Sequence, residues 1–284
     1  MIHMPFTIIA ANIIEFMNSS CILPSNISLS TTSSKHSNNK RNYIEKNKQF
    51  VICNNGVLDL NDIDGETGTF NLKPHSPRYK MTTQIHADYD PAAECPIFMQ
   101  YISELCTDQD GKVDTESMAM VQEYCGLIIS NINVMKTKKS LVMSSREGNS
   151  GKSQLFKVLE FLIGDDKMVN ISISEMNRGE NRFSLANIVG KRLIYQPDGT
   201  DIVIKDSSIF KQLVGADRIT IEGKGQNTFD YQFKGGVIIA CNGIPTFSDD
   251  KGNHVFERLL VLPIMRSIPI EKRDPDIADK MEKE

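Results

Sequence analysis

Residues 148–153 have the types and the spacing of the second half of a phosphate-binding loop. They read Gly-Asn-Ser-Gly-Lys-Ser, and Arg146 stands where the usual pattern has its first glycine. In such a loop the backbone N–H groups point at phosphate oxygens, the lysine reaches the β- and γ-phosphates, and the last hydroxyl ligates Mg²⁺. We therefore expect a nucleotide site. The residues expected to bind the nucleotide are Gly148, Asn149, Ser150, Gly151, Lys152 and Ser153.

The segments on either side separate this interpretation from a chance match. "KSLVMSS" before the loop is typical of a short strand, and "SQLFKVLEFLIG" after it has the period of an amphipathic helix ending at Gly164. A strand, a glycine-containing loop and a helix in this order favour phosphate binding. The alternative is a Gly-Ser turn with an exposed lysine. Arg146 is tolerable in the loop if its side chain points to solvent and its φ is negative.

A nucleotide site that hydrolyses also needs a carboxylate near the metal ion. The apolar run Leu193–Tyr195 leads to Asp198, and Asp201 lies three residues further along. We expect Asp198 to complete a metal site with Ser153, and Asp201 is the alternative acid. The same residues form a Pro-Asp-Gly turn, which arises without any function.

Two further polar residues stand at the ends of apolar runs. "GVIIACNGIP" places Asn242 after a predicted strand, where an amide could hold an attacking water against the γ-phosphate. "HVFERLLVLPI" places Arg258 before a strand, and an arginine offered to a neighbouring subunit's phosphates would stabilise transition-state charge. Taken alone, Asn242 is also explained by an ordinary turn and Arg258 by a surface position.

Short β-like runs separated by helical stretches predict an α/β fold, a parallel sheet with helices on both faces. Upstream, "QFVICNNGVLDL" is a hairpin signal, and the stretch 91–135 has helical spacing of its apolar residues. We expect three parts: an N-terminal helix and polar linker (1–48), a mainly helical domain (49–136) and the nucleotide-binding core (137–284).

Composition sets broad limits. The apolar share of 40% and the net charge of −4 are those of a soluble globular protein and do not advertise a nucleic-acid binder, although a local basic stripe would suffice. The six cysteines form no CxxC pair, so we expect reduced thiols and no metal site. No run approaches the roughly 20 apolar residues of a transmembrane helix. The apolar segment 4–17 lacks a basic start and a cleavage site, which favours an amphipathic helix over a signal peptide.

The order of these motifs is specific: a glycine loop, a strand-end acid, a basic hairpin, a strand-end asparagine and then an arginine. It resembles superfamily 3 helicases, and the chain is similar to the helicase portion of phage and plasmid primase-helicases, which are related to poxvirus-type replication NTPases. The resemblance covers roughly residues 49–269. The segments that carry it are "NNGVLDL", "HADYDPAAECPIFMQYISEL", "VQEYCGLII", "FSLANIVGKRLIYQPD", "FKQLVGADRITIE", "GVIIACNGIPTFSDD" and "FERLLVLPI".

The resemblance implies an AAA+-like P-loop ATPase that uses ATP and Mg²⁺ to move along or unwind single-stranded or forked DNA during replication. Lys152, Asp198, Asn242 and Arg258 would be its catalytic residues. A hairpin around Lys224 would project into the channel of a ring, a hexamer, and Lys224 would contact the DNA backbone. Primase activity would reside in the same or a partner chain, in the cytoplasm of a bacterial host, without a membrane.

The chain also departs from the family pattern. Arg146 replaces the loop's first glycine, Ser150 its asparagine, and Asp198 and Thr200 stand where glutamates are common. The chain stops at "DKMEKE", so we interpret it as a C-terminally truncated helicase module. The alternative is a degenerate nucleotide- or DNA-binding module of a prophage remnant without turnover. A small-molecule P-loop kinase is a third possibility, although no lid or substrate-binding motif is visible.

Overall fold

The structure is a computed structural model. It describes residues 50–64, 66–81, 83–130, 137–176, 184–200, 202–223, 227–250 and 253–284. The predicted N-terminal helix and linker, Asp201 and the Lys224 position lie outside these ranges. In the described part, no helix is long and apolar enough to cross a membrane.

The chain first forms a three-stranded antiparallel sheet from β1 (Phe50–Cys53), β2 (Gly56–Ile63) and β3 (Phe70–Lys73). The predicted hairpin is present: Asn54 and Asn55 make the turn, and Cys53 pairs with Gly56. After a short 3₁₀ turn (Pro77–Tyr79), the chain enters helices α2 (Pro96–Leu105) and α3 (Thr115–Ile129). Asp114 caps α3 by accepting hydrogen bonds from the backbone N–H groups of Glu116 and Ser117 at 3.0 and 3.2 Å.

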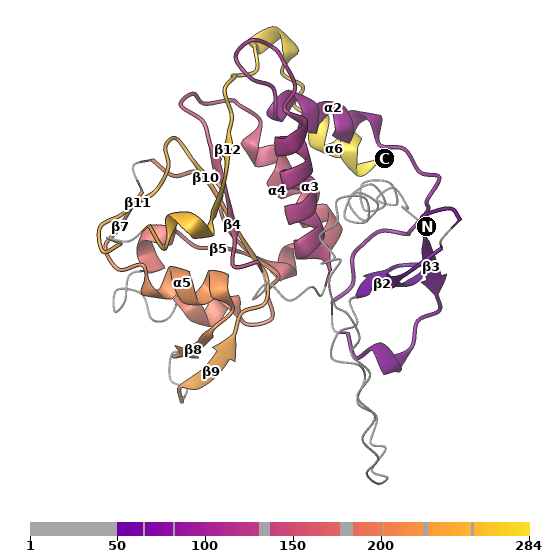
Figure 1. Ribbon diagram of the computed structural model, residues 1–284, viewed down its shortest axis with the longest axis horizontal. Helices are drawn as coiled ribbons and strands as arrows, with labels where there is room; N and C mark the ends of the chain where they lie inside the picture. The colour runs from indigo at the N-terminus through magenta and orange to yellow at the C-terminus, as the bar shows by residue number, and fades with distance from the viewer. Residues whose placement is uncertain are drawn as a thin grey trace.

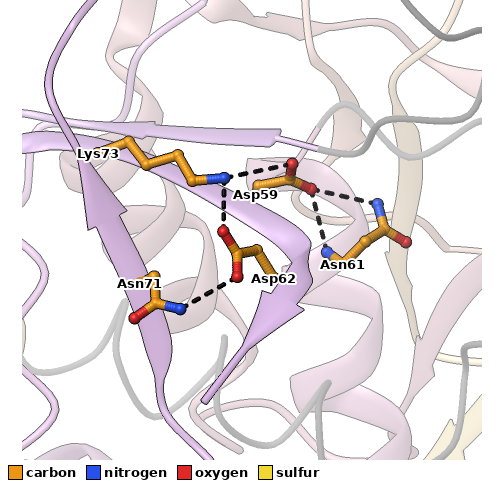
Figure 2. A network of polar contacts seen from close by, with 5 residues as sticks. All are labelled: Asp59, Asn61, Asp62, Asn71 and Lys73. Atoms are coloured by element: carbon orange, nitrogen blue, oxygen red, sulfur yellow. Dashed lines mark hydrogen bonds and ion pairs between the residues drawn. The ribbon is translucent and has the colours of Figure 1, made fainter.

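A cluster of polar side chains closes an irregularity between β2 and β3, shown in Figure 2. The Lys73 ammonium lies 2.6 Å from the Asp62 carboxylate and 3.6 Å from that of Asp59, which is buried. Asn71 donates to Asp62 at 3.0 Å, and Asn61 donates to Asp59. The hydrogen bond from Lys73 to Asp62 raises the pKa of the lysine. These contacts satisfy polar groups that the shifted strand register leaves without ladder partners.

The central sheet is parallel and has five strands in the order β12–β4–β10–β6–β5, which confirms the predicted α/β architecture. Its strands are β4 (Ser140–Ser144), β5 (Met168–Asn170), β6 (Leu193–Gln196), β10 (Gly236–Cys241) and β12 (Leu259–Pro263). The connecting helices are α4 (Lys152–Ile163) and α5 (Ser208–Gly215), with 3₁₀ turns at 165–167, 173–176, 184–188 and 256–258. The apolar runs in the sequence predicted the other four strands of this sheet but not β5.

Alternating side chains of the sheet enter two separate cores. Leu141, Met143 and Ile238 pack with helices α2, α3 and α4, whereas Val142 and Ile239 pack with α5 and the 3₁₀ turns. Successive residues of a strand point to opposite faces, so a sheet covered on both sides needs strands that are apolar throughout. Figure 1 shows the two layers, with α3 and α4 on one side of the strands and α5 on the other.

Three short elements complete the fold. β7 (Val203–Ile204) pairs with β11 (Thr246–Phe247), and β8 (Arg218–Ile221) pairs with β9 (Phe229–Gln232) as the predicted hairpin. A 3₁₀ turn (Ile270–Lys272) leads to α6 (Ile277–Glu282), which packs against α4 and α2. The carboxylate of Glu284 then accepts hydrogen bonds from Ile97 N and Phe98 N at 2.8 and 3.0 Å, in the first turn of α2.

Two side chains fix α3 to the starts of the central strands. The Tyr124 hydroxyl is buried and bonds both the N–H and the carbonyl of Val237 at 2.9 Å. The Arg192 guanidinium, just before β6, donates to the carbonyls of Leu127, Ile128 and Ser130 at the carboxyl end of α3. Burial lowers the pKa of Arg192 to about 10, so the residue remains a cation at neutral pH. A cation at this helix end is favourable because the last carbonyls lack partners within the helix.

Candidate nucleotide site

The loop between β4 and α4 has its unusual backbone at two positions. Gly151 (φ 86°) immediately precedes α4, and Asn149 has φ 56°, which asparagine tolerates better than most residues. Gly148 is not among the described residues with positive φ, and an added Cβ there would meet nothing within 4 Å. Asn149 and Gly151 therefore supply the unusual backbone conformation of the loop. Arg146 is exposed and also has no positive φ, so its side chain is accommodated.

Lys152 points back across the loop at the start of α4. Its side chain is largely buried, and its ammonium donates to the hydroxyls of Ser145 and Ser150, the latter at 3.3 Å. Ser150 in turn donates to Ser145 at 3.1 Å. Burial lowers the pKa of Lys152, while Cys241 and Asp198 act in the opposite direction. The loop thus holds a cation close to its own backbone and to Asp198.

Asp198 and Asn242 follow strands that end at the same sheet edge as the loop. Ser144 pairs with Cys241 and Gln196 pairs with Ile239, so the carboxyl ends of β4, β10 and β6 lie side by side. The Asn242 N–H donates to the Gly199 carbonyl at 2.9 Å, and its side-chain amide donates to the Thr200 hydroxyl at 3.3 Å. Asp198 and Asn242 are exposed. Because β10 lies between β4 and β6, Asn242 stands between the loop and the acid.

Gln196, the last residue of β6, stabilises the turn that carries Asp198. It is buried, accepts a hydrogen bond from Ile173 N at 2.8 Å, and donates to the Asp198 carbonyl at 3.3 Å. The final strand residue thereby links the chain after β5 to the turn that carries Asp198. The sequence analysis missed this residue, because a glutamine at the end of an apolar run carries no motif.

The oxygen donors present suit a shared Mg²⁺ site better than a protein cage. Ser153 is exposed in the first turn of α4, and Asp198 is exposed beyond β6. Among the described residues no group of three or more His, Cys, Asp or Glu side chains could hold a metal ion. Mg²⁺ commonly binds through one or two protein oxygens together with phosphates and waters. A hydroxyl and one carboxylate at the loop edge fit that pattern.

Arg258 does not join this group. It ends the 3₁₀ turn immediately before β12, where Ser140 Oγ donates to its carbonyl at 3.2 Å, and Leu259 pairs with Ser140. The loop begins at the other end of β4, four strand steps or about 13 Å away. The base of the β8–β9 hairpin lies at the same far edge, where β9 runs within four residues into β10. Arg258 therefore cannot serve the loop of its own chain in this arrangement.

The guanidinium of Arg258 lies against the carboxyl end of α5. Its Nη1 is 3.5 Å from the position a Cβ on Gly215 would take. Nε and Nη1 are buried and have no hydrogen-bond partner within the described part of the chain. Lys139 donates to the Glu257 carbonyl at 2.6 Å and helps hold the turn that carries the arginine. Two buried donors without acceptors are unfavourable, so hydrogen-bond acceptors from a second molecule would stabilise this side chain.

A cleft of about 430 Å³ opens beside the loop on the β12 side. Its apolar part comes from Pro263, Ile264 and Met265. The charged residues Arg146, Arg266 and Glu147 line it as well. The segment after β12 also fastens the loop: Ile264 N donates to Ser144 O at 2.7 Å and Ile268 N donates to Asn149 O at 2.9 Å. The departure from the glycine pattern at residue 146 thus adds a positive charge to the cleft wall.

Five of the six cysteines lie in the described ranges, and all five are buried free thiols. Burial raises the pKa of Cys53, Cys95, Cys106 and Cys125 to about 12, so these thiols stay protonated at neutral pH.

Two known families match separate parts of the chain. Residues 30–107 match a family described as "D5 N terminal like", and residues 143–258 match a family of unknown function, DUF5906. The second match runs from the end of β4 to Arg258 and so contains the loop, Asp198 and Asn242.

One solved structure shows the same fold at low sequence identity, and two others are less similar. The apo NrS-1 C-terminal region has a TM-score of 0.51 and 14% identity over 76% of this chain and 48% of that one. A second NrS-1 structure (residues 305–718) gives 0.48 and 14% over 78% and 51%. The JCV helicase gives 0.39 and 14% over 68% and 53%. This chain spans about half the length of the NrS-1 region.

Proposed function

We propose that this chain is a superfamily 3-type helicase module, an ATPase whose turnover drives movement along DNA, from a phage or plasmid replication protein. The observation that carries the proposal is the meeting of Lys152, Asp198 and Asn242 at one sheet edge, from three adjacent parallel strands. Groups at the carboxyl ends of parallel strands are the usual site of ligand binding in open α/β sheets. The shared fold with the NrS-1 region and the D5-like segment support the same class.

Each residue has a role that its position allows. Lys152 would exchange its serine partners for the β- and γ-phosphate oxygens, and Ser150 would remain part of the loop backbone that faces them. Asp198 would bind the metal ion together with Ser153, and the Asn242 amide would orient the attacking water. Mg²⁺, held by Ser153 and Asp198, would neutralise phosphate charge when bound. The neighbouring cleft, with apolar residues and two arginines, would take the base and ribose.

Arg258 would act between subunits of a ring, which we take to be a hexamer. Its own loop lies at the opposite end of β4, and its buried Nε and Nη1 donors have no hydrogen-bond partner among the residues that the structure describes. A neighbouring subunit's nucleotide would supply acceptors for both. The β8–β9 hairpin at the same edge would place Lys224 against single-stranded or forked DNA. Primase activity in the same or a partner chain, and work in the cytoplasm of a bacterial host, complete the proposal.

The decisive experiment compares ATP binding and DNA-stimulated ATPase activity in three variants. Lys152→Ala should weaken ATP binding about 10- to 100-fold, because it removes a charge-assisted contact to phosphate. Asp198→Asn should bind ATP within about threefold of the native protein yet hydrolyse it about 100-fold more slowly, because the change affects the metal ion and its water more than the contacts to phosphate. Lys157→Ala is the matched control, since this exposed lysine lies on the same helix.

The outcomes separate the candidate functions. Native protein that hydrolyses ATP faster with forked DNA supports the helicase. Binding without turnover in the native protein would favour the degenerate module, and the reasons would be Arg146 in the loop and an aspartate, Asp198, where glutamates are common. Phosphorylation of a small acceptor would favour a kinase. Equal ATP affinity in Lys152→Ala and Lys157→Ala would mean that the loop is no nucleotide site.

A further inference from the structure

The glycine loop is held by a tyrosine from the region that precedes the sheet. Tyr101 lies on α2, its side chain is buried, and its hydroxyl donates to the Gly151 carbonyl at 3.1 Å. Burial raises the pKa of Tyr101, so the hydroxyl keeps its proton and remains a donor.

This hydroxyl occupies the place of a helix hydrogen bond. In an α-helix the N–H of residue i bonds the carbonyl of residue i−4, which would pair Leu155 with Gly151. Here the Gly151 carbonyl accepts from Gln154 N at 3.0 Å and from Tyr101. Tyr101 therefore connects α2 to the carbonyl that immediately precedes the first turn of α4. That turn carries Lys152 and Ser153, so the hydroxyl helps set the direction of the peptide between Gly151 and Lys152.

Both sides of Gly151 are in contact with elements outside the loop. An added Cβ would lie 3.6 Å from the Tyr101 ring and 3.4 Å from Ile268 Cδ1. Ile268 belongs to the segment after β12, whose backbone also bonds Asn149. α2 is in turn held at its first turn by the Glu284 carboxylate. Movement of α2 therefore changes the surroundings of the loop directly.

We propose that Tyr101 is a positioning residue that holds the Gly151–Lys152 peptide ready for phosphate and couples the α2 region to nucleotide binding. This inference rests on the proposed nucleotide site. Coupling of this kind is reciprocal: if α2 stabilises the binding form of the loop, the bound nucleotide must stabilise α2 by the same free energy. The reciprocity gives a readout that simple loss of packing would not produce.

The test variant is Tyr101→Phe, which keeps the ring and removes only the hydroxyl. Tyr124→Phe is the matched control, because its hydroxyl is equally buried and also bonds backbone groups, but at the opposite edge of the sheet. For ADP with Mg²⁺, Tyr101→Phe should bind about fivefold more weakly, a typical effect of losing one hydrogen bond. Tyr124→Phe should bind within about twofold of the native protein. Melting temperatures establish that both variants are folded.

Hydrogen exchange provides the second measurement. Saturating ADP with Mg²⁺ should slow amide exchange in residues 96–105 of the native protein and of Tyr124→Phe, but not of Tyr101→Phe. If Tyr101→Phe binds ADP normally and α2 is still protected, Tyr101 is not the coupling residue, although the nucleotide site stands. If Tyr101→Phe melts far below Tyr124→Phe, exchange in α4 beyond its first turn serves as the folded reference. Native protein that binds no ADP would overturn the site and this inference together.

Discussion

The two glycines of the loop should respond oppositely to alanine. Gly151 has φ 86°, where an L-residue costs about 1–2 kcal/mol, whereas Gly148 has no positive φ and open space around its Cβ position. The contacts that a Cβ on Gly151 would make, at 3.4 and 3.6 Å, are ordinary van der Waals distances and add little. Both substitutions also restrict the unfolded chain, which stabilises the folded state by about 0.4–1 kcal/mol.

The unfolded-state contribution cancels when the two variants are compared with each other. Gly151→Ala should therefore be about 1–2 kcal/mol less stable than Gly148→Ala, and Gly148→Ala should be as stable as the native protein or slightly more so. With about 2–4 °C per kcal/mol for a domain of this size, calorimetry should separate their melting temperatures by several degrees. ADP affinity should fall in Gly151→Ala only. A Gly148→Ala variant at least as destabilised as Gly151→Ala would refute the backbone geometry on which this reasoning depends.

Two other expectations can be tested independently. Arg258→Ala should bind ATP normally but hydrolyse it about 10³-fold more slowly. When this variant is mixed in equal amounts with Lys152→Ala, the mixture should recover about one quarter of native activity. The reason is that about one interface in four then pairs an intact loop with an intact arginine. No recovery in mixtures shown to co-assemble counts against a role between subunits. The α3 cap titrates: hydrogen bonds to Ser117 lower the pKa of Asp114. Its stabilisation should be present above the unfolded value of about 3.9 and be lost as pH falls through the folded value, so Asp114→Ala should flatten the acid side of the stability curve while Asp114→Asn keeps the neutral-pH stability.

The parts that sequence predicted best are those whose signal is local. The apolar runs that became β4, β6, β10 and β12 are buried on both faces, so each reads as a continuous hydrophobic segment. The loop was visible because glycine and lysine spacing follows from phosphate geometry. β5 was missed because it has three residues, of which one is buried.

The parts that sequence could not predict depend on which strands are neighbours. Placing β10 between β4 and β6 brings Asn242 to the loop and Asp198, and starting β12 beside Ser140 sends Arg258 to the far edge. Neither arrangement is encoded in the spacing of residues along the chain. Tyr101 was also hidden, because it occupies an apolar position of α2 and its hydroxyl has no local sequence partner.

Strand β6 directly connects a contact with helix α3 to the turn that carries Asp198. Before the strand, Arg192 donates hydrogen bonds to three carbonyls at the carboxyl end of α3. After its four residues, the chain enters the turn that contains Asp198. A strand of this length spans about 13 Å and barely stretches, because its pleat is already nearly extended. If the carboxyl end of α3 moves away from the sheet, either the Arg192 hydrogen bonds break or β6 moves with α3 and shifts Asp198. A displacement of α3 at Arg192 would therefore be transmitted along β6 to the Asp198 carboxylate.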